Sequence, residues 1–163
     1  MLTIILPGYS PHNKDWAEEV KAKLNLDGKV EVFYWDHWQT GKSLNLKHEV
    51  ARILELVGDK PVNFIAKSVG TKVLMSVLPT IKEQINKVIL CGIPIDPVRY
   101  VKGIKLLKPE NLLVIQNSAD PFMPAKPIKI YLQLVDKRIR VVEKNAHNHD
   151  YPYFKDFEDF LTQ

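Results

Sequence analysis

Short apolar runs alternate with amphipathic helical stretches along the chain, and this alternation narrows the possible folds more than any other feature. The first run, residues 2–6, is unbroken, as expected of a strand buried on both faces of a parallel sheet. Further strands are predicted at 30–35, 62–66, 87–91, 112–116 and 139–142. Helices are predicted at 46–57, 69–78, 128–135 and 153–161, and one more begins near residue 13. This order predicts an α/β fold, a minimal three-layer sandwich with a mainly parallel sheet of about six strands.

The length and composition are those of one globular domain, which we expect to span residues 1–163. The net charge of +4 is modest and the lysines are scattered, so no nucleic-acid partner is expected. The single cysteine, Cys91, cannot form an intramolecular disulfide, and residues 1–6 lack the basic start of a signal peptide. No apolar run approaches the roughly 18 to 20 residues of a membrane span. We therefore expect a cytoplasmic protein with no membrane partner.

A serine stands between the third predicted strand and the helix that follows it. Ala66, two residues before Ser68, and Gly70, two residues after it, are small enough to let the backbone crowd together at a strained turn. This AxSxG pattern is typical of a nucleophile elbow, with alanine in place of the usual first glycine. Ser68 is therefore a candidate nucleophile.

Acidic and basic side chains follow other predicted strands, and loops at the carboxyl ends of strands build the site in an open α/β sheet. Asp120 lies four residues past the fifth strand in a turn braced by prolines. His147 and His149 lie between the sixth strand and the last helix. After the first strand, Pro7-Gly8-Tyr9-Ser10 is a tight turn whose free backbone N–H groups can face an anion.

With Ser68, Asp120 and His149 in this order, the chain resembles a small serine hydrolase of the α/β-hydrolase superfamily. The resemblance runs from the Pro7-Gly8 turn to the histidine loop, and residues 118–124 are similar to the acid loop of that family. The chain has no room for a separate cap domain. Its size therefore resembles that of the small lidless branch, such as the YdeN-like and retinoblastoma-binding-protein-like hydrolases.

The resemblance implies a Ser-His-Asp triad that cleaves a small acyl ester through an acyl-enzyme and needs no cofactor. Ser68 would attack the acyl carbon, His149 would take its proton and return it to the leaving group, and Asp120 would fix the imidazole tautomer. Backbone N–H groups of Tyr9 and Val69 would bind the oxyanion. Ser68 Oγ is then expected within hydrogen-bond reach of an imidazole that also reaches the acid, with looser contacts in a free enzyme.

Two role assignments have competitors in the sequence. His149 is preferred over His147 because Tyr151 and Phe154 stand two and five residues after it, as aromatics do after the catalytic histidine in many esterases that the chain resembles. Asp96, after the fourth strand, is an alternative acid, because some hydrolases place the carboxylate at that position.

Two further segments bear on the substrate. Residues 94–109 could form a short amphipathic helix that contacts an acyl group, or could equally pack in the core. The aromatic run 33–38 is interpreted as a strand end, with Trp35 and Trp38 at the rim of the site.

Other functional classes remain as alternatives. The same triad serves thioesters and amides, and a hydrolase-like binding protein without turnover would keep the same scaffold. A nucleotide-binding protein is disfavoured, because Thr40-Gly41-Lys42-Ser43 lacks the earlier glycine of a phosphate-binding loop. No metal site is expected, since His12, His37 and His48 are dispersed and lack metal-ligand spacing.

Overall fold

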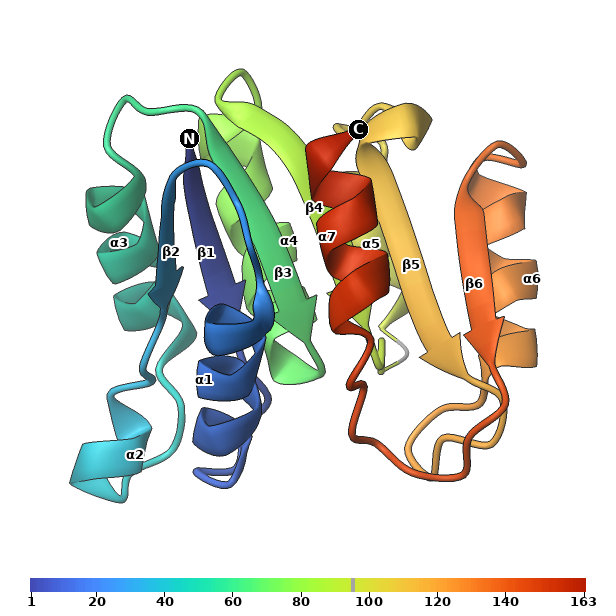
Figure 1. The fold of residues 1–163 in the computed structure, drawn as a ribbon, viewed down its shortest axis with the longest axis horizontal. Helices are drawn as coiled ribbons and strands as arrows, with labels where there is room; N and C mark the ends of the chain where they lie inside the picture. Colours follow the sequence, from blue (N-terminus) through green and yellow to red (C-terminus); the bar gives the residue numbers. More distant parts are fainter. Residues whose placement is uncertain (95) are drawn as a thin grey trace.

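The structure is a computed structural model that describes residues 1–94 and 96–163, and within these residues six strands form one sheet (Figure 1). All neighbouring strands are parallel, in the order β2-β1-β3-β4-β5-β6. The strands are β1 Leu2–Leu6, β2 Lys29–Val32, β3 Val62–Lys67, β4 Ile85–Cys91, β5 Leu112–Asn117 and β6 Arg140–Lys144. The predicted α/β architecture with about six strands is confirmed, and the sheet is parallel throughout.

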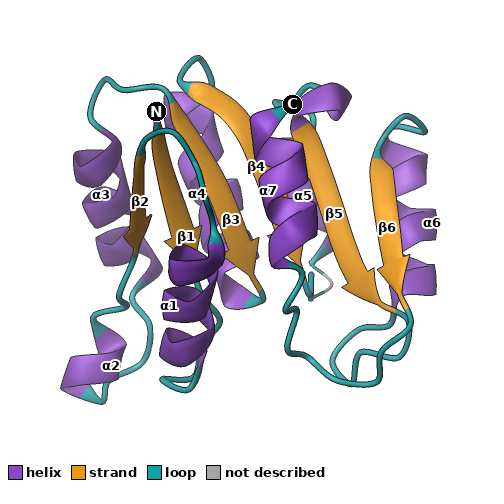
Figure 2. Ribbon diagram, in the orientation of Figure 1, coloured by secondary structure: helices purple, strands orange, loops and turns teal. Residues whose placement is uncertain are grey.

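The helices cover both faces of the sheet and so complete three layers (Figure 2). They are α1 Asn13–Lys23, α2 His37–Thr40, α3 Leu46–Val57, α4 Val69–Ile81, α5 Pro97–Ile104, α6 Ala125–Val135 and α7 Phe154–Thr162, with a 3-10 helix η1 at Pro109–Asn111. Helices α1 and α7 lie in front of the sheet in Figure 1, and α3, α4, α5 and α6 lie behind it. No helix among the described residues is both long enough and apolar enough to cross a bilayer.

Successive side chains of each strand point to opposite faces of the sheet, so the hydrophobic core consists of two clusters, one on each face. On β1, Ile4 and Leu6 join the larger cluster beneath α3 to α6, whereas Ile5 joins the cluster beneath α1 and α7. Each of these side chains is fully buried, because successive side chains of a strand point to opposite faces and both faces are covered. The unbroken apolar run at the start of the sequence is thus explained by a central strand buried on both sides.

Strand β2 is shorter than the sequence pattern predicted, ending at Val32 rather than at residue 35. The chain leaves the edge of the sheet there and enters the short helix α2. Its path is held by the Trp35 indole, which turns into the interior and donates hydrogen bonds to the carbonyls of Pro7 and Gly8 at 3.2 and 3.1 Å. The pattern of aromatic residues predicted a longer strand, because it contains no signal for the turn of the chain after Val32.

The chain crosses from one side of β1 to the other between β2 and β3, which makes the β1/β3 pair the switch point of the sheet. In open α/β sheets the crevice outside the carboxyl ends of the strands at such a point binds ligands. The Pro7-Gly8 turn follows β1 and Ser68 follows β3. The fold therefore places the candidate nucleophile beside the candidate anion-binding turn.

We expect Gly70→Ala to destabilise the protein, although alanine normally favours a helix over glycine by about 1 kcal/mol. A Cβ at residue 70 would lie 2.3 Å from the Leu6 carbonyl oxygen, so α4 would have to move away from β1. Overpacking of this kind typically costs about 1–3 kcal/mol in the free energy of unfolding, measurable in urea. Gly103→Ala is the control, because its Cβ would first meet the flexible Met75 side chain. Equal stability of Gly70→Ala and the wild type would contradict the close approach.

Candidate active site

Ser68 occupies a strained strand-to-helix turn. Its φ of 52° and ψ of −119° lie in a region that non-glycine residues rarely adopt. The turn is held by the Ser68 N–H, which donates to the Cys91 carbonyl, and by Thr71 Oγ1, which donates to the Ser68 carbonyl at 2.6 Å. Residue 70 must be a glycine because a Cβ there would lie 2.3 Å from the Leu6 carbonyl oxygen. Ala66, on the other side of Ser68, is fully buried. The local geometry is that of the predicted elbow.

Asp120 lies almost fully buried in the turn after β5 and accepts four hydrogen bonds. Oδ2 accepts from His149 Nδ1 and from the Tyr151 hydroxyl, each at 2.6 Å. Oδ1 accepts from the backbone N–H groups of Phe122 and Met123 at 2.8 and 3.2 Å. Burial by itself raises the pKa of Asp120, but the hydrogen bonds outweigh burial and lower the pKa below its usual value. The carboxyl group is therefore ionised at neutral pH.

The contact with Asp120 fixes which nitrogen of His149 carries the proton. A carboxylate can only accept, so His149 donates from Nδ1. Burial lowers the pKa of His149 below 6.5, despite the opposing effect of Asp120, and the charge of Lys67 lowers it further. The imidazole is therefore neutral at pH 7, and its Nε2 keeps a free lone pair.

Nε2 of His149 is buried and has no hydrogen-bond partner among the described residues. The expected hydrogen bond with Ser68 Oγ is thus not formed in this structure. Contacts between nucleophile and base are often long in free enzymes and shorten when substrate binds. Ser68 and His149 nevertheless line the same cavity.

Gly92 and Tyr151 shape the histidine site. The sequence marked Tyr151 only by its spacing from His149 and gave Gly92 no role there. Gly92 follows β4 with a φ of +58°, and a Cβ on it would lie 2.6 Å from Cε1 of His149. Tyr151 is fully buried and accepts a hydrogen bond from the Asn117 N–H at 3.1 Å while it donates to Asp120. A glycine directly after a strand and an aromatic residue two positions after His149 were the sequence signals of this packing.

Two buried polar residues at the end of β5 tie the surrounding loops together. Gln116 accepts from the Ile93 N–H and donates to the Met123 carbonyl, at 2.9 and 2.6 Å. Asn117 donates to the Asn148 carbonyl at 2.8 Å. The acid loop and the histidine loop are thus fixed to the same strand end. Polar residues that close an apolar run were a usable signal for this role.

The competing residues lie elsewhere. His147 is exposed, and its side chain makes no hydrogen bond with the described residues. Asp96 is the N-cap residue directly before α5 and pairs with Arg99 at 3.8 Å rather than with an imidazole. Of the predicted candidates, Asp120 and His149 are joined by a hydrogen bond, and His149 lines one cavity with Ser68 and Tyr9.

The turn after β1 is held by the aromatic segment 35–38. The Tyr9 carbonyl accepts hydrogen bonds from His37 Nε2 at 2.8 Å and from the Trp38 indole at 2.7 Å. Trp35, which we expected at the rim of the site, is fully buried and bonds to the Gly8 carbonyl. In a trans peptide the carbonyl and the N–H point in opposite directions. The Tyr9 N–H therefore points away from Trp35.

A second N–H group is available beside Ser68. Val69 is the first residue of α4, so its N–H has no partner within the helix. The N-terminal end of this helix also carries a partial positive charge. Of the two backbone donors that the resemblance implied, Val69 is thus the first residue of α4, directly after Ser68, and Tyr9 lies in the turn after β1.

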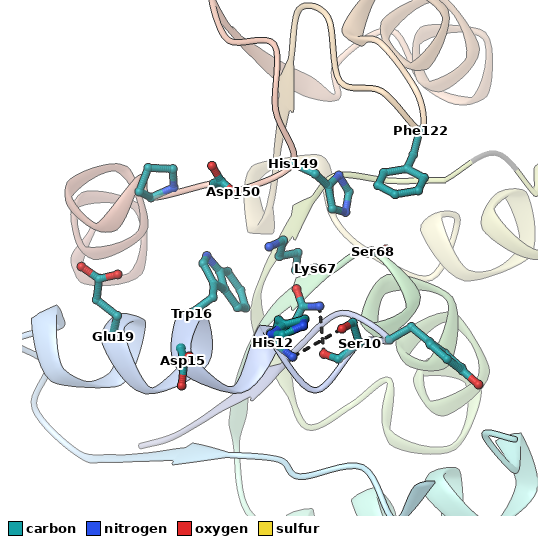
Figure 3. A pocket seen from close by; sticks show the side chains of 13 residues that line it. Ser10, His12, Asp15, Trp16, Glu19, Lys67, Ser68, Phe122, His149 and Asp150 are labelled. Carbon is teal, nitrogen blue, oxygen red and sulfur yellow. Dashed lines mark hydrogen bonds between the residues drawn. The ribbon is translucent and has the colours of Figure 1, made fainter. Parts of the chain in front are cut away.

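A cavity of about 690 Å³ lies between the N-terminal part of α1 and the histidine loop (Figure 3). Its lining residues are Tyr9, Ser10, His12, Asn13, Asp15, Trp16, Glu19, Lys67, Ser68, Phe122, His149, Asp150 and Pro152. The Phe122 ring packs edge-on against His149, with the ring centroids 4.8 Å apart, and is itself largely exposed. The described part of 94–109 does not line this cavity, because Tyr100 and Ile104 of α5 pack in the core.

Lys67 is a further lining residue that sequence analysis passed over. It ends β3 directly before Ser68, and burial lowers the pKa of its ammonium group to about 8. Its Nζ lies over the Trp16 ring, 5.0 Å from the centroid. Within the described ranges, no group of three or more histidine, cysteine, aspartate or glutamate side chains could hold a metal ion.

Known proteins resemble this chain in structure rather than in sequence. No protein-family model matches the sequence, and no curated protein matches it significantly. A serine hydrolase without a lid, XC6422 from Xanthomonas campestris, matches with a TM-score of 0.74 at 18% identity, over 99% of this chain and 78% of that one. A serine hydrolase homologue from Coxiella burnetii gives 0.76 at 16% identity, over 99% and 83%.

A YdeN-like hydrolase from Pectobacterium atrosepticum matches with a TM-score of 0.70 at 18% identity, over 98% of this chain and 90% of that one. The chain therefore has the α/β-hydrolase fold, and its structural neighbours include lidless serine hydrolases. At these identities the likeness establishes the fold alone.

We expect Tyr151→Phe to lower the free energy of unfolding by about 2 kcal/mol, because the buried Asp120 carboxylate loses a charged hydrogen bond and the Asn117 N–H loses its acceptor. Tyr153→Phe is the matched control. Its hydroxyl donates to the Asn117 side chain in a half-buried position, and its loss is expected to cost about 1 kcal/mol or less. Urea unfolding measures both, and equal costs would argue against a special role for Tyr151.

Proposed function

We propose that the protein is a serine hydrolase that cleaves small carboxylic esters through a Ser68–His149–Asp120 triad and an acyl-enzyme. The observation that carries the proposal is the 2.6 Å hydrogen bond from His149 to the buried, ionised Asp120. It leaves Nε2 of the neutral imidazole without a partner, and His149 lines the same cavity as Ser68. The fold shared with serine hydrolases supports the same assignment.

In the proposed reaction the Ser68 oxygen bonds to the acyl carbon while its proton passes to His149 Nε2. The imidazolium returns this proton to the departing alcohol oxygen, and the bond between that oxygen and the acyl carbon breaks. Water then attacks the acyl-enzyme with the same base, which releases the acid and restores Ser68. Asp120 keeps Nδ1 protonated and stabilises the imidazolium at each step.

The oxyanion is assigned to the backbone N–H groups of Tyr9 and Val69. The hydrogen bonds from Trp35, His37 and Trp38 to the carbonyls of the first turn hold its peptides in place before substrate arrives. Preorganised donors of this kind need no rearrangement during the reaction, and loss of one typically costs about 10² to 10³ in turnover.

The size of the acyl group is inferred from the cavity. A volume of about 690 Å³ suits a small or medium substrate. The neighbour from Xanthomonas campestris is described as lacking a lid, and we propose the same open access here. Thioesters and amides are alternative substrates of the same triad. The proposal also includes a cytoplasmic location and a small-molecule acyl substrate, with no nucleic-acid or membrane partner.

A binding protein without turnover is the second candidate, and the missing Ser68–His149 hydrogen bond favours it. The two candidates make opposite predictions for a simple ester. A hydrolase releases product with a burst, whereas a binding protein releases none above the rate in buffer.

We expect Ser68→Ala and His149→Ala each to lower kcat/KM for p-nitrophenyl acetate by about 10⁴-fold or more, because nucleophile and base act as a unit. His147→Ala is the matched control and should keep most of the activity, since that side chain is exposed. A loss with His147→Ala and not with His149→Ala would move the base to His147. No wild-type turnover of esters, thioesters or amides would favour the binding protein.

We also expect kcat/KM for a neutral ester to rise with pH through a midpoint below 6.5 and then to level off. Only the neutral imidazole can accept the Ser68 proton, and the pKa of His149 lies below 6.5 because burial disfavours the charged ring. Activity is therefore present above this pKa and lost as the pH falls through it. His147→Ala should show the same midpoint, and a wild-type midpoint above 7 would contradict the buried base.

A further inference from the structure

Lys67 carries a buried positive charge that the proposed triad does not use. Only 5% of the residue is exposed, and its ammonium group makes no hydrogen bond or ion pair with the described residues. The Trp16 ring offers its π face at 5.0 Å but no hydrogen-bond acceptor. The stem of Lys67 is buried, but Nζ is not fully enclosed and borders the cavity, so its hydrogen-bond acceptors must come from water or from a ligand in the cavity.

The ammonium group borders the cavity that contains the candidate nucleophile. Figure 3 shows Lys67 between Trp16 and His149, and all three residues line this cavity with Ser68. Because the pKa of Lys67 is about 8, the group is charged at neutral pH. Lys67 and Ser68 are consecutive in the chain and line the same cavity, so one short substrate can contact both side chains.

The other charges around the cavity limit the kind of anion. Asp15, Glu19 and Asp150 also line it, and all three are exposed to solvent. Asp150 and the buried Asp120 raise the pKa of Lys67, but burial outweighs both, and water and salt screen the exposed carboxylates. The exposed carboxylates do add repulsion that grows with the charge of the ligand. A single carboxylate fits this setting better than a phosphate dianion.

We propose that Lys67 binds a carboxylate on the substrate, so that the preferred substrates are half-esters of short dicarboxylic acids. In this arrangement Nζ donates hydrogen bonds to the carboxylate while the ester carbonyl lies at Ser68. The inference rests on the proposed function and specifies its substrate class. Lys67 would act in binding, through the charge of the substrate, and not in the transfer of the Ser68 proton.

The test compares two esters with the same acyl length, p-nitrophenyl hemiadipate and p-nitrophenyl hexanoate, with the rates in buffer subtracted. The readout is the ratio of kcat/KM for the anionic ester to that for the neutral ester. Lys67→Met should lower this ratio about 10- to 100-fold, the size of a charge-assisted hydrogen bond. Lys72→Met removes a charge from α4, outside the cavity lining, and should leave the ratio unchanged. Equal ratios in Lys67→Met and the wild type would overturn the proposal.

Lys67→Met keeps a long stem that can pack on Trp16, and it removes a charge that was buried at a cost, so it is expected to fold. Circular dichroism and urea unfolding check this. If the methionine variant does not fold, Lys67→Gln replaces it in the same comparison.

If neither ester is turned over, the proposed hydrolase function fails and binding alone tests Lys67. Monomethyl adipate is then titrated into the wild type and Lys67→Met and followed by NMR. Saturable binding that weakens about tenfold in Lys67→Met would support the carboxylate site in a protein without turnover. Absent binding, or equal binding by both, would overturn the site as well.

Discussion

The buried carboxylate of Asp120 determines which nitrogen of His149 carries the proton. Four hydrogen bonds keep it ionised, and an ionised carboxylate obliges His149 to donate from Nδ1. Nε2 is then left as a buried lone pair with no partner among the described residues. If Asp120 were protonated or turned away, the imidazole could adopt the other tautomer and offer no base to Ser68.

The topology of the sheet places this pair and Ser68 at the same edge of the molecule. Ser68 follows β3 and the acid turn follows β5, so both lie at the carboxyl edge of one parallel sheet. Each loop has its own anchor: Gly70 lets α4 approach β1, and Gln116 fixes the acid loop. The strain at Ser68 is sustained because the layers on both sides are fully packed.

The features that could be predicted from the sequence are those set by residues close together in the chain. Strands and helices are marked by the periodicity of apolar residues, and the Ser68 turn is marked by the small residues around it. The six-stranded sheet confirmed the predicted α/β architecture. Tyr151 and Gly92 act through contacts with residues remote in the chain, which periodicity does not encode. Trp35 was misplaced for a related reason, since an aromatic residue at a strand end looks alike whether it faces the rim or the interior.

The central claim is that Ser68 is a nucleophile activated by His149. Its most direct test is to treat the wild type with a fluorophosphonate and to map the adduct by peptide mass spectrometry. The account predicts a single adduct, on the Ser68 oxygen, because only an activated serine attacks such a phosphorus centre at a useful rate. No adduct, or one on another residue with Ser68 unmodified, would contradict it.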